Sequence, residues 1–178
     1  MRVLALSGSL RAQSLNTQVV REAARLAPPG LVFTFWERLD DLPHFSPERG
    51  TEPLPPSVVE LRGLLHEADA LLICTPEYVH TMPAVLKNLL EWVVSSVDCV
   101  GKLAAAWSVS PAMDGGARAH ASLVHTLEVM SARVVHGASL CLTLAHSGPD
   151  ANGPLLDAEQ EDSLRTALAA LAASGEAS

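Results

Sequence analysis

A chain of 178 residues, 48% of them hydrophobic, is long enough to bury one core but short for two ordinary domains. Its net charge of −8 argues against a nucleic-acid partner, because neutralising phosphates needs clustered Lys and Arg. No apolar run approaches the roughly 18 residues of a membrane span, so we expect no membrane association. Three cysteines without pairing or ligand spacing indicate a reducing compartment and no metal site.

The first apolar run, residues 3–6, is interpreted as a strand rather than as part of a signal peptide. It is shorter than the roughly 7–15 residues of a signal-peptide core, and Arg11 follows soon after it. We therefore expect a cytoplasmic protein.

Apolar segments alternate along the chain with segments of helical periodicity, which predicts strands and helices in strict alternation. This order is typical of a parallel sheet with helices on both faces. Five such units predict a flavodoxin-like three-layer α/β/α sandwich, strand order 2-1-3-4-5, as a single domain over residues 1–178 with 174–178 frayed. All five strands are expected to be buried on both faces. The expected strands are 3–7, 31–36, 70–74, 103–108 and 134–140, and the expected helices are 15–26, 57–66, 84–97, 116–130 and 157–171.

The loop after the first strand, GSLRAQSLN at residues 8–16, lies where ligands bind in such sheets, at the carboxyl edge where the strand order reverses. Backbone N–H groups at the start of the next helix favour an anion by about 0.3–2 kcal/mol. Ser9, Ser14 and Asn16 add neutral donors, and Arg11 adds a charged fork that suits two phosphate oxygens. A terminal phosphate monoester fits this chemistry. The alternative is that Ser14 is only a helix cap and Arg11 a solvated side chain.

Two common nucleotide-binding loops do not match. A Walker A loop needs a lysine, which this loop lacks, and a dinucleotide fingerprint needs three glycines where this loop has one.

A second polar turn follows the third expected strand, within ICTPEYVHTMPAVLKNLLEWV at residues 73–93. Pro76 ends the strand, and Pro83 is well placed near the first turn of the next helix. The backbone amides of Glu77, Tyr78 and Val79 would therefore face the same crevice as the first loop.

Together the two loops resemble the NADPH-dependent FMN reductase family of flavodoxin-like proteins, which also covers quinone, azo-dye and chromate reductases. The family patterns are G-S-x-R-x-x-S-x-N and P-E-Y-N-x-S-x-P-G-x-L-K-N-x-x-[DE]-W. The resemblance spans residues 1 to about 137. The matching residues are Gly8, Ser9, Arg11, Ser14 and Asn16 in the first pattern, and Pro76, Glu77, Tyr78, Pro83, Leu86, Lys87, Asn88, Glu91 and Trp92 in the second.

The resemblance implies an enzyme in which NADPH or NADH gives a hydride to bound FMN, which then reduces a quinone, an azo compound or a flavin. The flavin carries the chemistry, so no catalytic side chain is assigned. Positive dipoles near the ring are expected from the backbone around Ser110 and from the helix that starts at Gly116. The implied cofactor-binding residues are Ser9, Leu10, Arg11, Ser14, Leu15, Asn16, Pro76, Glu77, Tyr78, Val79, Ser110, Gly115 and Gly116.

The chain departs from the family pattern at three places. Val79 replaces an asparagine, Ala84 replaces a glycine, and Ala112 and Met113 replace a Gly-Gly pair. The backbone N–H of Val79 could still bond the flavin, but the missing carboxamide removes a contact worth roughly 0.5–1.5 kcal/mol. Met113 could narrow the substrate pocket or line it for an apolar acceptor.

The helix expected at 83–98 has an apolar arc of roughly 200°, wider than the ~100° stripe of a one-sided surface helix. The excess could be buried more deeply in the monomer, or it could be a self-association face. Members of the family usually form dimers here, which favours a homodimer or homotetramer. The polar arc is expected to hold Lys87, Asn88, Glu91, Ser95 and Asp98.

Several single residues have a plain structural interpretation. Tyr78 could donate a proton to a quinone, but a packing residue with a hydrogen-bonded hydroxyl is favoured. His80 and His120 could lie near the pocket mouth, and neither is given a catalytic role. Cys74 is expected to be a small buried hydrophobe, and Asp114 a helix cap.

The alternative function is that of a flavodoxin-like electron carrier or of a flavin-binding protein without turnover. The acidic net charge fits a flavodoxin. The arginine in the phosphate loop and the scarcity of aromatic residues do not, because a flavodoxin holds its ring between aromatic side chains.

Overall fold

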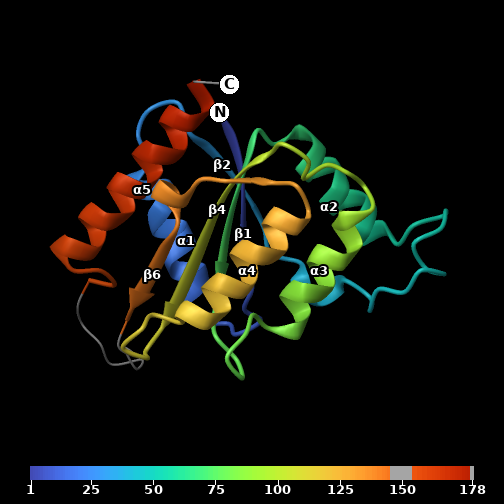
Figure 1. The fold of residues 1–178 in the computed structure, drawn as a ribbon, viewed down its shortest axis with the longest axis horizontal. Helices are drawn as coiled ribbons and strands as arrows, with labels where there is room; N and C mark the ends of the chain where they lie inside the picture. The colour runs from blue at the N-terminus through green and yellow to red at the C-terminus, as the bar shows by residue number, and fades with distance from the viewer. Residues whose placement is uncertain (145–153, 177–178) are drawn as a thin grey trace.

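The computed structural model describes residues 1–144 and 154–176, and Figure 1 shows a sheet flanked by helices on both sides. All strand pairs are parallel, in the order β2-β1-β3-β4-β5, with β6 also paired to β4. The predicted flavodoxin-like sandwich and its strand order are therefore confirmed, with a sixth strand added. The strands are β1 (Arg2–Ser7), β2 (Val32–Trp36), β3 (Ala70–Thr75), β4 (Leu103–Ser110), β5 (Arg133–Val134) and β6 (Leu140–Thr143), and the helices are α1 (Leu15–Leu26), α2 (Pro56–Glu67), α3 (Ala84–Val94), α4 (Ala117–Val129) and α5 (Ala158–Glu176).

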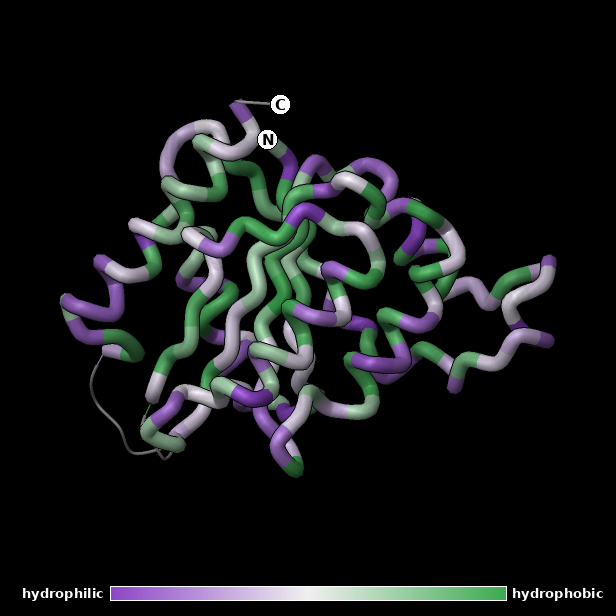
Figure 2. The backbone as a smooth tube through the Cα atoms, in the orientation of Figure 1, coloured by the Kyte–Doolittle hydropathy of each residue, from purple (hydrophilic) through white to green (hydrophobic). Residues whose placement is uncertain are grey.

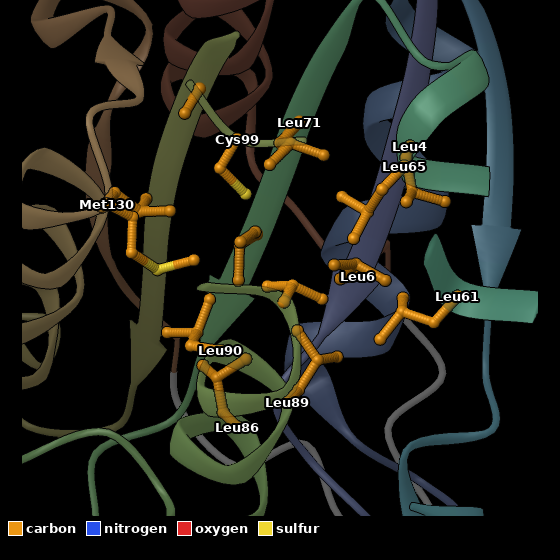
Figure 3. Close-up of a cluster of buried hydrophobic side chains, with 14 of the residues drawn as sticks. Leu4, Leu6, Leu61, Leu65, Leu71, Leu86, Leu89, Leu90, Cys99 and Met130 are labelled. Atoms are coloured by element: carbon orange, nitrogen blue, oxygen red, sulfur yellow. The ribbon is translucent and has the colours of Figure 1, made fainter. Parts of the chain in front are cut away.

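The two faces of the sheet are covered by different helices because side chains alternate along each strand. Leu4 and Leu6 face α2, α3 and α4, whereas Val3 and Ala5 face α1 and α5. Figure 2 shows the hydrophobic residues concentrated in the central strands. Figure 3 shows the first of these cores, with leucines of α2 and α3 lying over those of β1 and β3. The labelled core residues are Leu4, Leu6, Leu61, Leu65, Leu71, Leu86, Leu89, Leu90, Cys99 and Met130.

The expected burial of every strand on both faces is correct for β3 and β4 but wrong for β2, and for β5 and β6, most of whose residues are exposed or half-buried. Every residue of β3 and β4 is buried. In contrast, β2 is an edge strand whose Val32 and Phe35 are 62% and 39% exposed. The predicted strand order already places β2 at the edge, but its apolar sequence does not reveal that its side chains are exposed there.

The single strand expected at 134–140 is wrong, because the chain forms two short strands there. β5 pairs with the start of β4 and β6 pairs with its end, and a 3-10 turn, His136–Ala138, separates them. The hydroxyl of Ser139 accepts a hydrogen bond from the N–H of Ala106 at 3.2 Å, which satisfies a donor of β4 beside the interruption. Gly137 in the middle of the run is the one sequence signal for this break.

Helix α3 lies deeper in the monomer than its polar arc predicts. Asn88, expected on that arc, is buried. Its Oδ1 accepts from the N–H of Phe45 at 2.8 Å, and its Nδ2 donates to the carbonyl of Pro43 at 3.1 Å, which also accepts from Trp92 Nε1 at 2.7 Å. Asn88 and Trp92 therefore anchor the long segment between β2 and α2, which extends from the body of the protein in Figure 1.

The ends of two helices also differ from expectation. α3 ends at Val94 rather than at residue 97, and Val97 has a left-handed φ of 56°. α5 continues through Glu176, so residues 174–176, expected to be frayed, are helical, while 177 and 178 lie outside the described residues. Within the described ranges, no helix combines the length and apolar character needed to cross a bilayer.

Asn88→Ala is expected to destabilise the protein by about 1–3 kcal/mol, because it leaves the N–H of Phe45 without its partner in a partly buried site. Lys87→Ala is the matched control. It removes only an exposed ion pair with Glu91, worth about 0.3–0.5 kcal/mol. Urea denaturation of both variants measures the difference, and equal losses would contradict the anchoring role of Asn88.

Candidate functional site

Three loops meet at the carboxyl edge of the sheet and enclose a cavity of about 260 Å³. They follow β1, β3 and β4, on both sides of the point where the strand order reverses. Nine of the thirteen residues expected to bind the cofactor line this cavity. The lining residues are Ser9, Arg11, Ser14, Leu15, Asn16, Pro76, Glu77, Tyr78, Val109, Ser110 and Pro111.

The sequence motifs did not predict two of the lining residues, Val109 and Pro111. They flank Ser110 at the end of β4, so the signal was their position beside a predicted site residue. Of the expected residues, Leu10 instead lines a neighbouring pocket of about 270 Å³, which shares Ser9 and Arg11 with the first. Val79, Gly115 and Gly116 are not among the lining residues.

A larger cavity, of about 510 Å³, lies at the opposite edge of the sheet. It is lined by residues that precede β1, β3 and β4, such as Met1, Asp69 and Gly101, and by the end of α5. None of the predicted site residues lies there. Because ligands of parallel α/β sheets bind beyond the carboxyl ends of the strands, the smaller cavity is the candidate site.

The loop between β1 and α1 offers hydrogen-bond donors to an anion. Ser14 caps α1, its Oγ accepting from the N–H of Thr17 at 3.4 Å, and Ser9 Oγ accepts from the N–H of Arg11 at 3.3 Å. Each hydroxyl uses its oxygen as acceptor, so its hydrogen can still be donated to a ligand. With the N–H groups of the first helical turn and the guanidinium of Arg11, this donor set fits a phosphate monoester.

Asn16 has an internal role that the sequence did not show. It is 4% exposed, and its Nδ2 donates to the carbonyl of Val109 at 3.4 Å. Its Oδ1 accepts from the thiol of Cys74 at 3.2 Å. Cys74 is fully buried, as expected, and burial raises the pKa of its thiol. One amide thus ties the start of α1 to the ends of β3 and β4.

Glu77 joins the turn after β3 to the start of α4. Its Oε2 accepts from the N–H groups of Ala119 and Arg118 at 3.0 and 3.1 Å, and its Oε1 lies 3.1 Å from His80 Nδ1. The hydrogen bond from Ala119 is the main cause that lowers the pKa of the Glu77 carboxyl below its ordinary value of 4.5. The carboxylate is therefore ionised and bound at a helix N-terminus.

The expectation that the start of α4 faces the ring as a free positive dipole is corrected by these contacts. Glu77 binds two of its first N–H groups, and Asp114 Oδ1 accepts from the N–H of Gly116 at 3.1 Å. The predicted helix-cap role of Asp114 is wrong in detail, because Gly116 is the N-cap of α4 and Asp114 bonds the N–H of that residue in the turn before the helix. Two carboxylates thus compensate the positive dipole at the start of α4. The backbone around Ser110 remains as the candidate hydrogen-bond donor to the ring.

Gly115 and Gly116 lie behind the cavity rather than in its wall. Gly115 has a φ of 62°, and a Cβ atom there would lie 2.9 Å from the backbone of Cys141 and Leu142. Gly116 has a φ of 83°, and a Cβ atom would lie 3.3 Å from Ser110 Cβ and 3.4 Å from Glu77 Cβ. The two glycines therefore let the loop after β4 pack against β6 and against the turn after β3.

The turn at Val79 is strained. Tyr78 and Thr81 exchange two main-chain hydrogen bonds of 3.0 and 3.1 Å, and the residues between them, Val79 and His80, have φ values of 52° and 61°. This two-residue turn, with positive φ at both positions, favours Asn and Gly. A β-branched residue in left-handed backbone costs about 1–2 kcal/mol. The Val79 side chain is 96% exposed and does not line the cavity.

Tyr78, His80 and His120 differ in their relation to the cavity. Tyr78 lines it and is 47% exposed, and within the described ranges no group hydrogen-bonds its hydroxyl, unlike the favoured expectation. His80 is exposed beside Glu77. His120 is not at the mouth but half-buried against β4, its Nε2 3.0 Å from the carbonyl of Ala106, and burial lowers its pKa.

The family model for NADPH-dependent FMN reductase matches residues 1–147. An NAD(P)H-dependent FMN reductase of Pseudomonas aeruginosa is 33% identical over 173 residues, which cover 96% of this chain and 93% of that protein. A quinone reductase of Escherichia coli K12 is 30% identical over 139 residues, covering 76% of this chain and 74% of the relative.

Among solved structures, FerB, a flavoenzyme NAD(P)H:(acceptor) oxidoreductase from Paracoccus denitrificans, superposes with a TM-score of 0.87. The two chains are 27% identical, and the match covers 99% of this chain and 97% of FerB. The similarity therefore includes the segment beyond residue 137, where the sequence motifs end.

Glu77→Gln is expected to lower stability by about 1–3 kcal/mol at pH 7, because it weakens charge-assisted hydrogen bonds. The pKa of Glu77 is lower in the folded protein than in the unfolded chain. Its stabilising contribution is therefore complete above its ordinary pKa of 4.5 and is lost as the pH falls through the folded value. Thermal unfolding of variant and wild type between pH 7 and pH 3 measures the effect.

The control is Glu128→Gln on the outer side of α4, where the side chain is 48% exposed. We expect it to change stability by less than about 0.5 kcal/mol across this range. A gap between Glu77→Gln and wild type that stays constant down to pH 3 would contradict the prediction.

Proposed function

Because the chain belongs to the NADPH-dependent FMN reductase family, we propose that it is an FMN-dependent NAD(P)H oxidoreductase. Its acceptor would be a quinone, an azo compound or a flavin, and it would act as a single cytoplasmic domain. The observation that carries this proposal is the cavity at the carboxyl edge of the sheet, which is lined by both motif loops. The names of the relatives, an FMN reductase and a quinone reductase, support the same chemistry.

The residues present fit FMN in two parts of the cavity. Its phosphate would lie over the loop of residues 9–16, where Ser9, Ser14, Arg11 and the first N–H groups of α1 supply donors. Its ring would lie against the turn after β3 and the end of β4. The assigned contacts there are Pro76, Glu77, Tyr78, the backbone of Val79, and Ser110, with Leu10, Leu15 and Asn16 beside the phosphate and Gly115 and Gly116 supporting the ring site from behind.

The protein would bind and orient the reactants, and no side chain needs to act as acid or base. FMN, when bound, supplies the redox chemistry between the nicotinamide and the acceptor. The carboxylate of Glu77 already accepts two hydrogen bonds from the start of α4, so it does not present an uncompensated anion to the site. Because the nicotinamide and the acceptor would use one pocket in turn, the proposal predicts ping-pong kinetics.

The proposal is tested by adding FMN to purified protein, recording its absorbance, and then measuring NADPH and NADH oxidation with a quinone present. We expect a yellow protein that oxidises at least one of the two nucleotides. A yellow protein that oxidises neither would instead be an electron carrier or a flavin-binding protein. A protein that stays colourless after removal of free FMN would contradict flavin binding itself.

A homodimer or a homotetramer is proposed through the helix predicted at 83–98, observed as α3, together with the adjacent surface of α4. A groove of about 280 Å³ between these helices is lined by residues that include Leu90, Val94, Val129 and Met130. Most apolar residues of α3 are buried in the monomer, but Val94 and Val129 are 50% and 68% exposed. Burying this groove against a second copy would remove it from water.

Arg11→Ala is expected to weaken FMN binding about tenfold to a hundredfold, because a charge-assisted hydrogen bond is worth about 1.5–3 kcal/mol. Arg11→Lys should recover part of the affinity, since it keeps the charge but not the fork. Arg165→Ala, which removes an exposed arginine of α5, is the control. Quenching of FMN fluorescence gives the dissociation constants, and an unchanged value for Arg11→Ala would remove Arg11 from the phosphate site.

Val129→Asp is expected to shift the protein toward the monomer, because a dimer would have to bury the new charge. Val59→Asp, at a valine of α2 that is 54% exposed and outside the groove, is the matched control. Sedimentation over a range of concentrations measures the masses. A monomeric wild type, or a dimer that Val129→Asp leaves intact, would contradict this interface.

A further inference from the structure

We propose that Val79 and Met113 form an apolar rim at the cavity, which makes the site prefer uncharged electron acceptors to anionic ones. The inference rests on the proposed function, because it concerns the acceptor of that same site. It concerns two positions at which this chain departs from the family pattern.

Val79 has an unfavourable backbone conformation and an unfavourable exposure to water. Its φ of 52° suits Asn or Gly, and its apolar side chain is 96% exposed. The bridge between Tyr78 and Thr81 fixes this conformation through two main-chain hydrogen bonds. Strain of this kind is characteristic of ligand-binding turns, and here it holds an exposed apolar side chain on the turn that follows the lining residue Tyr78. Figure 2 shows hydrophobic colouring at the tip of the loop between β3 and α3.

Met113 presents a second apolar side chain from the loop after β4. The side chain is 99% exposed, but its backbone is anchored: the hydroxyl of Thr143 on β6 donates to the carbonyls of Ala112 and Met113 at 3.1 and 3.2 Å. The side chain is thus extended into solvent from a fixed position. A thioether on three rotatable bonds can adapt to ligands of different shape.

Both loops border the same cavity. Tyr78 and Pro111, close in sequence to Val79 and Met113, line it. The loops also converge at Gly116, where a Cβ atom would contact both Ser110 and Glu77. An acceptor that covers these two side chains would remove them from water, and fully burying either one is worth about a tenfold gain in affinity.

The experiment compares an uncharged naphthoquinone with its sulfonate in FMN-loaded protein. Val79→Thr keeps the β-branched shape and the strain but replaces a methyl group by a hydroxyl, and Met113→Gln keeps the length of the side chain. Val79→Asn relieves the strain as well. The control is Ser131→Asn, at a residue whose φ is also left-handed, 61°, and which lies before β5 at the far edge of the sheet.

For the uncharged quinone, we expect kcat/KM to fall about threefold to tenfold in Val79→Thr, Val79→Asn and Met113→Gln. For the sulfonate, we expect kcat/KM of these variants to stay within about twofold of the wild type. For Ser131→Asn, we expect the same with both quinones. Equilibrium dialysis of the uncharged quinone against oxidised protein should show the same loss of affinity. In FMN-free protein, Val79→Asn should raise the melting temperature relative to wild type, whereas Val79→Thr should not.

The wild type and all variants could be active and have the same ratio of kcat/KM for the two quinones. This result would overturn the rim and leave the proposed function intact. An equal fall in kcat/KM for both quinones would also overturn the rim, whether or not the variants dissociate into monomers. The two side chains would then support the structure of the cavity or of a subunit interface without distinguishing between acceptors. A wild type that binds no FMN or oxidises no nucleotide overturns the proposed function, and the rim with it.

Discussion

The amide of Asn16 holds together the three chain segments that make the cavity. It lies at the start of α1, accepts from the thiol of Cys74 on β3 and donates to the carbonyl of Val109 on β4. Because this group is buried, the loss of either partner would leave a polar atom unsatisfied, so the three segments are held in one arrangement. This side chain therefore adds to the pairing of β1, β3 and β4 in holding the loop before α1 in position relative to the other two loops.

Local signals in the sequence were enough to predict most of the fold. Ser14 and the apolar period that follows it define α1, whose observed bounds are the predicted ones. The buried strands β3 and β4 are continuous apolar runs that end in turns, and the loops after them could be located from their motif residues. The predicted strand order placed β2 at the edge, but the exposure of its side chains and the break between β5 and β6 were not predicted, because they depend on which neighbours a strand finds in the sheet.

The site was predicted at the level of loops, but not at the level of contacts. Asn88 belongs to a family motif, yet its partners are Pro43 and the N–H of Phe45, more than forty positions earlier. Glu77 was expected beside the cofactor, and it lines the cavity, but its carboxylate is bound to the start of α4, some forty positions later. Such pairings depend on how distant elements pack. They show that part of each motif serves to position the loops rather than to contact a ligand.

The burial of Cys74 affects how the protein tolerates the compounds it is proposed to reduce. Quinones are electrophiles that alkylate sulfur, and the thiolate is the form that reacts. Cys74 is fully buried, and its hydrogen-bond partner Asn16 lines the cavity, so its sulfur lies one side chain behind the wall. Burial raises the pKa of this thiol and keeps it protonated at physiological pH. The sulfur behind the cavity is thereby kept in its least nucleophilic state, unlike the exposed thiol of Cys141.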